Sequence, residues 1–206
     1  KPFLLLKQLH ARLDKLNQED RSWSEYLKDG VKYYSDEPSN EFVREIRRFA
    51  PDMREELLAV VANDPAPARR QEAIELLNWA GSVPATSLDL LDAIDDSDRD
   101  VRANAARYFF PRLELLPDQF PWKRLIEGLS RQLARPSHQD RTKALYCLLG
   151  LCKRRPESID TIKSMSERRV RQLNEATLLP TIKAPTDELL KMFSLPPLKK
   201  PDPVGF

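Results

Sequence analysis

A run of aspartates between residues 89 and 100 is the densest set of potential metal ligands in the chain. Its members are Asp89, Asp92, Asp95, Asp96, Asp98 and Asp100. The spacing Asp96-x-Asp98-x-Asp100 imitates the opening of a calcium-binding EF-hand loop. However, Val101 stands where that loop requires glycine, and Arg107 stands where it requires a bidentate glutamate. Capping of a helix that begins near Asp98 explains these carboxylates better, so we expect no metal site.

The histidines and cysteines show no zinc-binding or nucleophilic arrangement. His10 and His138 are the only histidines, and neither has a second histidine or cysteine ligand three or four positions away. On one helix, Cys147 and Cys152 would point about 140° apart, which disfavours a disulfide and predicts buried free thiols. A helix would also hold His138 and Cys147 about 13 Å apart, too far for a nucleophilic pair. We therefore expect no catalytic residue, no cofactor and no enzymatic activity.

Positive charge gathers in the C-terminal half of the chain. Residues 1–100 hold 14 basic and 21 acidic residues, whereas residues 101–206 hold 20 basic and 11 acidic residues. Arginine-rich helices near Trp122 and Tyr146 could follow a phosphate backbone, so nucleic-acid binding is an alternative function. Two solvated faces, or self-association of opposite ends, would explain the same asymmetry.

Composition narrows the fold class and the compartment. The chain has 41% hydrophobic residues, too many for a disordered protein, and only 5 glycines, too few for a hairpin-rich all-β fold. No apolar run is long enough to span a membrane. Free cysteines favour a reducing compartment, so we expect a cytoplasmic protein. Because the chain begins Lys-Pro-Phe without methionine, the sequence leaves open whether a signal or membrane anchor has been removed.

Helical spacing of apolar residues dominates the whole sequence. It predicts a first helix over 6–16, a second over 23–34 capped by Ser22, and a third over 42–49 that stops before Pro51. Further helices are predicted over 57–62, 73–80, 87–95, 101–109, 122–133, 144–151 and 159–173, with a last short helix after Thr186. No strand is predicted, and the proline-rich tail over 195–203 is predicted to be extended or disordered.

Three of these helices open with the same short pattern. Arg70, Arg102 and Arg141 each follow a turn and precede an alanine by three positions. The turns before the first two arginines begin at Asp64 and Asp96. The arginines are 32 and 39 residues apart, a spacing typical of stacked helical hairpins.

This pattern resembles the HEAT-repeat family, in which a helix, a D-P-x-x-x-V-R turn and a second helix form each repeat. The segment with Asp96, Val101, Arg102 and Ala105 is the best match, and the resemblance covers about residues 52–154. It implies an all-α fold, an α-solenoid of antiparallel helical hairpins with about three clear repeats plus flanking helices. It also implies a structural ladder of acidic residues and arginines, formed here by Asp64, Arg70, Asp96, Arg102 and Arg141.

From this resemblance we expect three segments: N-terminal helices over 1–50 that flank or cap the solenoid, repeats over 51–175, and a short helix with a proline-rich tail over 176–206. The expected function is a non-enzymatic scaffold or adaptor that binds a protein or peptide on the concave face lined by the second helices. The residues expected to contact the partner are Arg107, Tyr108, Arg131, Arg135 and Lys143. The alternative is phosphate-backbone binding through the basic half, as in DNA-repair glycosylases built from HEAT-like repeats, with Trp79, Tyr108 and Trp122 as possible pocket walls.

Overall fold

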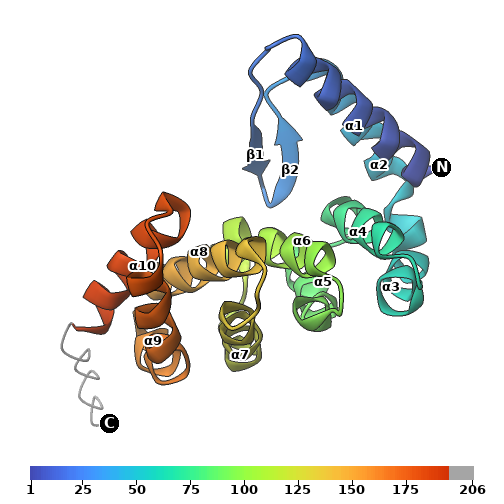
Figure 1. The fold of residues 1–206 in the computed structure, drawn as a ribbon. Helices are drawn as coiled ribbons and strands as arrows, with labels where there is room; N and C mark the ends of the chain where they lie inside the picture. Colours follow the sequence, from blue (N-terminus) through green and yellow to red (C-terminus); the bar gives the residue numbers. More distant parts are fainter. Residues whose placement is uncertain (195–206) are drawn as a thin grey trace. The chain divides into compact units, whose positions relative to one another are not determined.

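The computed structural model describes residues 1–194, which form ten α-helices and one two-stranded sheet (Figure 1). The mostly helical fold expected from the sequence is confirmed. The tail expected to be extended, residues 195–206, lies outside the described residues. The chain divides into two compact units, Lys1–Pro121 and a second unit that begins at Trp122.

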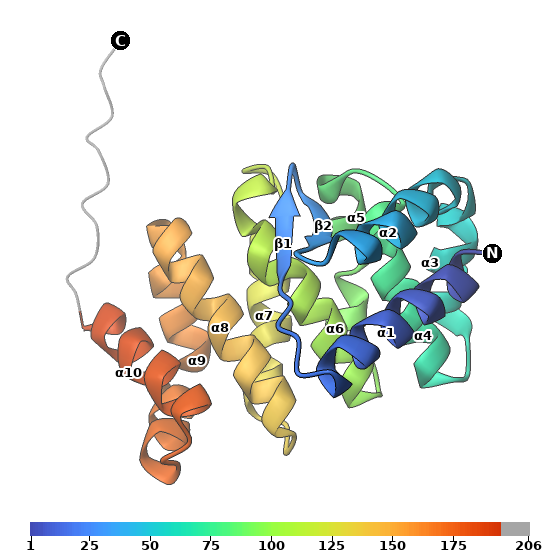
Figure 2. The same ribbon diagram turned by 90° about the horizontal axis from the view of Figure 1, so that it is seen from above.

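The first unit opens with two helices that pack side by side, α1 (Pro2–Gln18) and α2 (Glu37–Phe49) (Figure 2). Helix α1 buries one apolar stripe, formed by Leu6, Leu9, Leu13 and Leu16. Helix α2 begins earlier than expected because the Asp36 side chain caps it, accepting a hydrogen bond from the Ser39 N–H. The same carboxylate accepts two hydrogen bonds from the Arg12 guanidinium, at 3.0 and 2.8 Å, which ties α2 to α1.

The segment predicted as a second helix is instead a β-hairpin. Strand β1 (Glu25–Lys28) pairs antiparallel with strand β2 (Val31–Tyr34). Asp29 and Gly30 form the turn, with φ angles of 54° and 77°. A two-residue hairpin turn requires these left-handed values, and an Asp-Gly pair adopts them readily. Both the helix over 23–34 and the expected absence of strands are therefore wrong, because turn chemistry and strand-favouring aromatic residues outweigh the helical spacing.

Four further helices complete the first unit: α3 (Arg54–Asn63), α4 (Pro67–Leu76), α5 (Val83–Asp89) and α6 (Arg99–Phe109). Four short 3₁₀ segments accompany them. Segment η1 (Pro51–Met53) precedes α3, η2 (Leu77–Trp79) and η3 (Asp92–Asp95) flank α5, and η4 (Phe110–Leu115) follows α6. Helix α3 packs against α4, and α4 lies beside α6. Ala73 on α4 and Ala105 on α6 are fully buried, and such small residues let helices approach closely.

The second unit contains α7 (Trp122–Leu133), α8 (His138–Arg154), η5 (Pro156–Ser158), α9 (Ile159–Ala176) and α10 (Pro180–Phe193). Helix α7 packs against α8 and α9, and α10 packs against α8 and α9. Ser137 caps α8, as its spacing to Asp140 predicts. Helix α10 begins before Thr186, not after it. The Thr186 hydroxyl donates to the Ile182 and Lys183 carbonyl oxygens one turn earlier, next to the internal Pro185.

Candidate binding surface on the hairpin

The inner face of the hairpin carries a buried cluster of charges. Lys32 on β2 is 8% exposed, and its Nζ lies 2.8 Å from Glu75 Oε1 of α4. The same nitrogen lies 3.4 Å from Glu25 Oε1 of β1. The second oxygen of Glu75, Oε2, lies 3.0 Å from His10 Nε2 of α1. One carboxylate therefore joins α1, β2 and α4.

The pKa shifts of these groups favour their charged forms. Burial by itself would raise the pKa of Glu75, but the charge of Lys32 and the hydrogen bond from His10 lower it to about 2. Burial would likewise lower the pKa of Lys32, but the charges of Glu75 and Glu25 hold it above its ordinary value. The hydrogen bond to Glu75 raises the pKa of His10 above 6.5. The contacts of this cluster fasten the hairpin to α1 and α4.

The main chain of the hairpin is also held in place. Trp79 Nε1 donates a hydrogen bond to the Lys32 carbonyl oxygen at 3.0 Å, and Arg112 Nε donates to the Gly30 carbonyl oxygen at 3.2 Å. Gly30 is packed so closely that a Cβ atom would lie 2.7 Å from Val83 Cγ2. The hairpin is therefore an integral part of the first unit.

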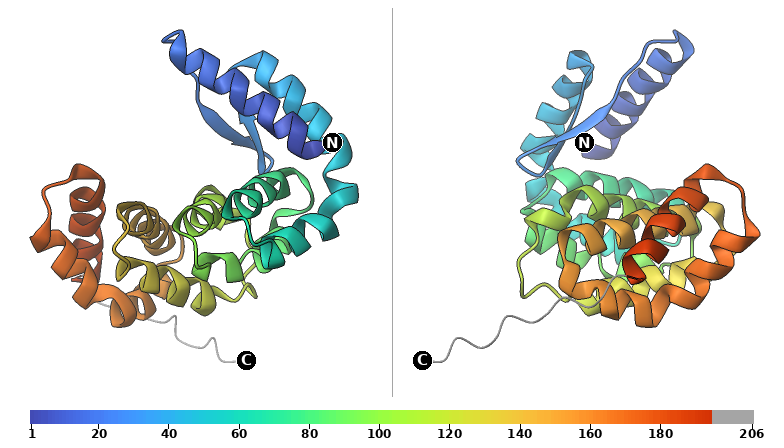
Figure 3. Two further views of the ribbon diagram at one scale, coloured as in Figure 1. Left: turned by 45° about the vertical axis from the view of Figure 1, so that its right-hand side comes forward. Right: turned by 90° about the vertical axis from the view of Figure 1, so that its left-hand side faces the viewer.

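Two residues expected to contact a partner, Arg107 and Tyr108, lie on α6. Tyr108 is 3% exposed, so its ring belongs to the core, which corrects the expectation that it contacts a partner. Arg107 is exposed, but its Nη2 lies 2.6 Å from Glu25 Oε2 on β1. Contacts from Lys32, Glu25 and Trp79 thus place the chain's own hairpin over the α4 and α6 helices (Figure 3). In this unit, the hairpin therefore contacts the face that was expected to receive a peptide.

The other three residues expected at the interface lie in the second unit. Arg131 is exposed near the end of α7, Arg135 is half-buried in the following turn, and Lys143 is half-buried on α8. The structure brings Arg135 and Arg141 together, since Arg141 Nε donates to the Arg135 carbonyl oxygen at 2.7 Å.

The three repeated arginines make the same main-chain contact. Arg70, Arg102 and Arg141 each donate to the carbonyl oxygen of the residue six positions earlier, at 2.8, 2.7 and 2.7 Å. Arg70 also forms two charged hydrogen bonds with the Asp96 carboxylate, at 2.9 and 2.8 Å. Asp64 and Asp96 each accept the main-chain N–H two residues later. Each arginine therefore closes the turn before its helix.

The remaining chemical candidates also have structural roles. Asp96 is engaged by Arg70, and Asp98 caps α6 by accepting the first N–H groups of that helix. Within residues 1–194, no group of three His, Cys, Asp or Glu side chains could hold a metal ion. Trp79 is 4% exposed and belongs to the core. Both cysteines are buried, and burial raises the pKa of the Cys152 thiol to about 12, which disfavours a reactive thiolate.

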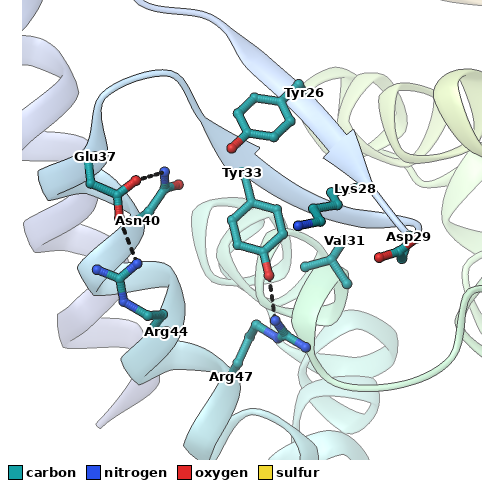
Figure 4. Close-up of a pocket in the computed structure, with 9 residues that line it drawn as sticks. All are labelled: Tyr26, Lys28, Asp29, Val31, Tyr33, Glu37, Asn40, Arg44 and Arg47. Atoms are coloured by element: carbon teal, nitrogen blue, oxygen red, sulfur yellow. Dashed lines mark hydrogen bonds and ion pairs between the residues drawn. The ribbon is translucent and has the colours of Figure 1, made fainter.

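The outward face of the hairpin and helix α2 border an open recess of about 260 Å³, which we call the hairpin recess (Figure 4). Its lining residues are Tyr26, Lys28, Asp29, Val31, Tyr33, Glu37, Asn40, Arg44 and Arg47.

Stacked tyrosines and a guanidinium form the centre of the hairpin recess. The Tyr26 and Tyr33 rings stack with their centroids 5.9 Å apart and their planes at 22°. Arg47 Nη1 donates to the Tyr33 hydroxyl at 2.5 Å (Figure 4). Arg44 pairs with Glu37 at 2.8 Å. Arg47, by contrast, has no carboxylate within ion-pair distance among the residues that the structure describes.

This surface was not predicted, because the apolar spacing over residues 23–34 indicates a helix there. The Asp29-Gly30 pair between two stretches rich in tyrosine and valine was the signal that would have revealed it.

No protein-family model matches the chain, and no curated protein matches it. No helix among residues 1–194 has both the length and the apolar character needed to cross a bilayer.

Proposed function

We propose that this chain is a non-enzymatic scaffold that binds a segment of another protein, and that the hairpin recess is its contact surface. The observation that carries the proposal is the stack of the exposed Tyr26 on the half-buried Tyr33, beside the Arg47 guanidinium. That guanidinium donates to the Tyr33 hydroxyl and pairs with no carboxylate among the described residues. Tyrosine and arginine are enriched among the residues that dominate binding energy at protein interfaces. Because the hairpin is anchored through Lys32 and Gly30, this surface is presented without a large ordering cost.

A HEAT-like α-solenoid is part of the same proposal. Its support is the packing within each unit: α4 lies beside α6 in the first, and α7 beside α9 and α8 beside α10 in the second. Helical hairpins that stack in a solenoid place equivalent helices next to each other in this way. The common contact of Arg70, Arg102 and Arg141 supports a repeated turn. Binding on the α4 and α6 face of the first unit is replaced by binding on the outward side of the hairpin.

Photo-crosslinking tests the proposed surface. A benzophenone amino acid at position 26 keeps an aromatic ring there, and Tyr26 is 47% exposed. The matched control is the same amino acid in place of Leu88 on α5, which is 51% exposed and does not line the hairpin recess. We expect position 26 to capture a discrete protein, insensitive to nuclease and weakened by Arg47→Ala. Equal capture at both positions, or capture of nucleic acid alone, would contradict the proposal.

Nucleic-acid binding is the second candidate, favoured by a shallow recess along α9 that Lys163, Arg168 and Arg171 line. Two of these cations are already engaged: Lys163 Nζ donates to the Phe193 carbonyl oxygen, and Arg171 pairs with Glu167 at 2.6 Å. Fluorescence anisotropy with duplex DNA over a range of salt concentrations decides between the candidates. A phosphate-binding surface would give a log–log slope of about −0.9 per contacted phosphate, whereas we expect weak binding at physiological salt.

A further inference from the structure

The outer edge of β1 carries main-chain groups that no other strand in residues 1–194 uses. The Ser24 carbonyl oxygen accepts a hydrogen bond from the Ser35 N–H at 2.9 Å, which sets the register at the open end of the hairpin. In an antiparallel pair, hydrogen-bonded and non-hydrogen-bonded residues alternate. Tyr26 and Lys28 therefore direct their N–H and C=O groups toward β2, and Glu25 and Leu27 direct theirs outward. Among the described residues, no group accepts from or donates to the outward main chain of Glu25 and Leu27.

The opposite edge of the hairpin, on β2, is closed by side chains. Asn40 mimics a neighbouring strand, since its Oδ1 accepts from the Tyr34 N–H at 2.9 Å and its Nδ2 donates to the Tyr34 carbonyl oxygen at 2.8 Å. Trp79 Nε1 donates a hydrogen bond to the Lys32 carbonyl oxygen on the same edge. Of the two edges of the hairpin, only that of β1 is left open by the described residues, and a free edge is a template for pairing with an extended chain.

The side chains along β1 define what such a strand must carry. Tyr26 and Lys28 lie on the outward face, two positions apart, and both are exposed. Lys28 makes no ion pair within the described part of the chain. A neighbouring strand places its own residues directly opposite these two, at about 5 Å. An apolar residue would pack on the Tyr26 ring, and a carboxylate two positions away would pair with Lys28. Asp29, the acidic residue next to Lys28, lies beyond the strand in the turn.

We propose that the outer edge of β1 binds an extended acidic segment of a partner protein, in which an apolar residue lies two positions from a carboxylate. This inference rests on the proposed function of the hairpin recess, because it names the part of the partner that the recess binds. The main chain of the segment adds a third strand to the hairpin, and its outward side chains contact Tyr26 and Lys28.

The probe is a synthetic peptide that repeats Val-Thr-Glu-Thr, so that valine and glutamate alternate on one face of the strand. Binding to the full chain is measured by fluorescence anisotropy. We expect replacement of glutamate by lysine in the peptide to weaken binding about tenfold or more. The Lys28→Glu variant is expected to reverse this preference. Arg48→Glu is the matched control, because Arg48 is exposed on α2 and does not line the hairpin recess.

Backbone N-methylation of the peptide tests the main-chain pairing without changing the protein. An added strand uses the N–H groups of alternate residues only. Methylation of all threonines, or of all valines and glutamates, should therefore weaken binding about tenfold in one case and leave it nearly unchanged in the other. The sensitive set reports whether the strand runs antiparallel or parallel to β1.

Three results would overturn this inference. The first is no binding of the acidic peptide, and the second is equal affinity for both methylated peptides. The third is concentration-dependent self-association that the peptide does not compete with, which would make a second copy of the chain the occupant. Loss of the edge pairing with intact crosslinking at position 26 would leave the hairpin recess as a binding surface. Loss of that crosslinking would remove the proposed function itself.

Discussion

The Glu75→Gln substitution removes the charge on which the inner face of the hairpin depends. Glu75 contacts Lys32 Nζ at 2.8 Å and His10 Nε2 at 3.0 Å. In the variant, the nearest carboxylate to the Lys32 ammonium is Glu25, at 3.4 Å. Because Lys32 is only 8% exposed, water compensates little for the lost negative charge.

The expected loss follows from the burial of this pair. Removing one partner of a buried ion pair costs about 3–5 kcal/mol. The Glu75 side chain is 20% exposed and Glu25 remains, so we expect a value near the lower end, about 3 kcal/mol. For a chain of this size, that loss corresponds to a decrease in Tm of roughly 6–12 °C.

Urea unfolding followed by circular dichroism measures the free energy, and hydrogen exchange of the amides over 31–34 localises it to the hairpin. The control is Glu19→Gln, because Glu19 is 41% exposed and pairs with Lys15 at 3.7 Å. Exposed pairs contribute little, so the control should change stability by less than about 1 kcal/mol. A Glu75→Gln loss no larger than that of the control, with unchanged exchange over 31–34, would refute the reasoning.

The same substitution has a defined pH dependence. The pKa of Glu75 is lowered from an ordinary value of 4.5 to about 2 in the folded chain. A lowered carboxyl pKa gives stability that is present above the unfolded pKa and is lost as the pH falls through the folded pKa. The stability difference between the wild type and Glu75→Gln should therefore shrink from about pH 5 to about pH 2.

Three other substitutions test separate parts of the first unit. The pKa of His10 is raised above 6.5 by the hydrogen bond to its carboxylate partner, so the protonated ring stabilises the fold below about pH 6.5 and this contribution is lost as the pH rises. His10→Gln should flatten the corresponding decline in Tm. Gly30→Ala should destabilise by about 2 kcal/mol in urea unfolding, because φ is 77° and the added Cβ would lie 2.7 Å from Val83 Cγ2. Arg102→Ala should cost about 1–3 kcal/mol, since the buried Arg102 side chain donates to the Asp96 and Ser97 carbonyl oxygens and both contacts are lost; unchanged stability with a lost partner would instead show a binding role.

Local patterns predicted the helices of this chain well. The stripe from Leu6 to Leu16, the cap at Ser137 and the helix over 122–133 all appear in the structure. Their signals lie within a few residues of each other, because helical hydrogen bonds and caps are local. The hairpin was also determined locally, by Asp29 and Gly30, but the apolar spacing around it fits a helix as well.

Only the tertiary structure decided which surface of the first unit is open. Glu75 is 43 positions from Lys32 and 65 from His10, so no local pattern relates their charges. The position of Tyr108 on its helix allowed contact with a partner, but the neighbouring elements bury its side chain. The burial of a side chain and the partners of a charge depend on which distant elements pack against it. The sequence therefore specified the helices and the turn. Packing determined that the hairpin contacts α4 and α6 and that Tyr26, Tyr33 and the edge of β1 lie on its other side.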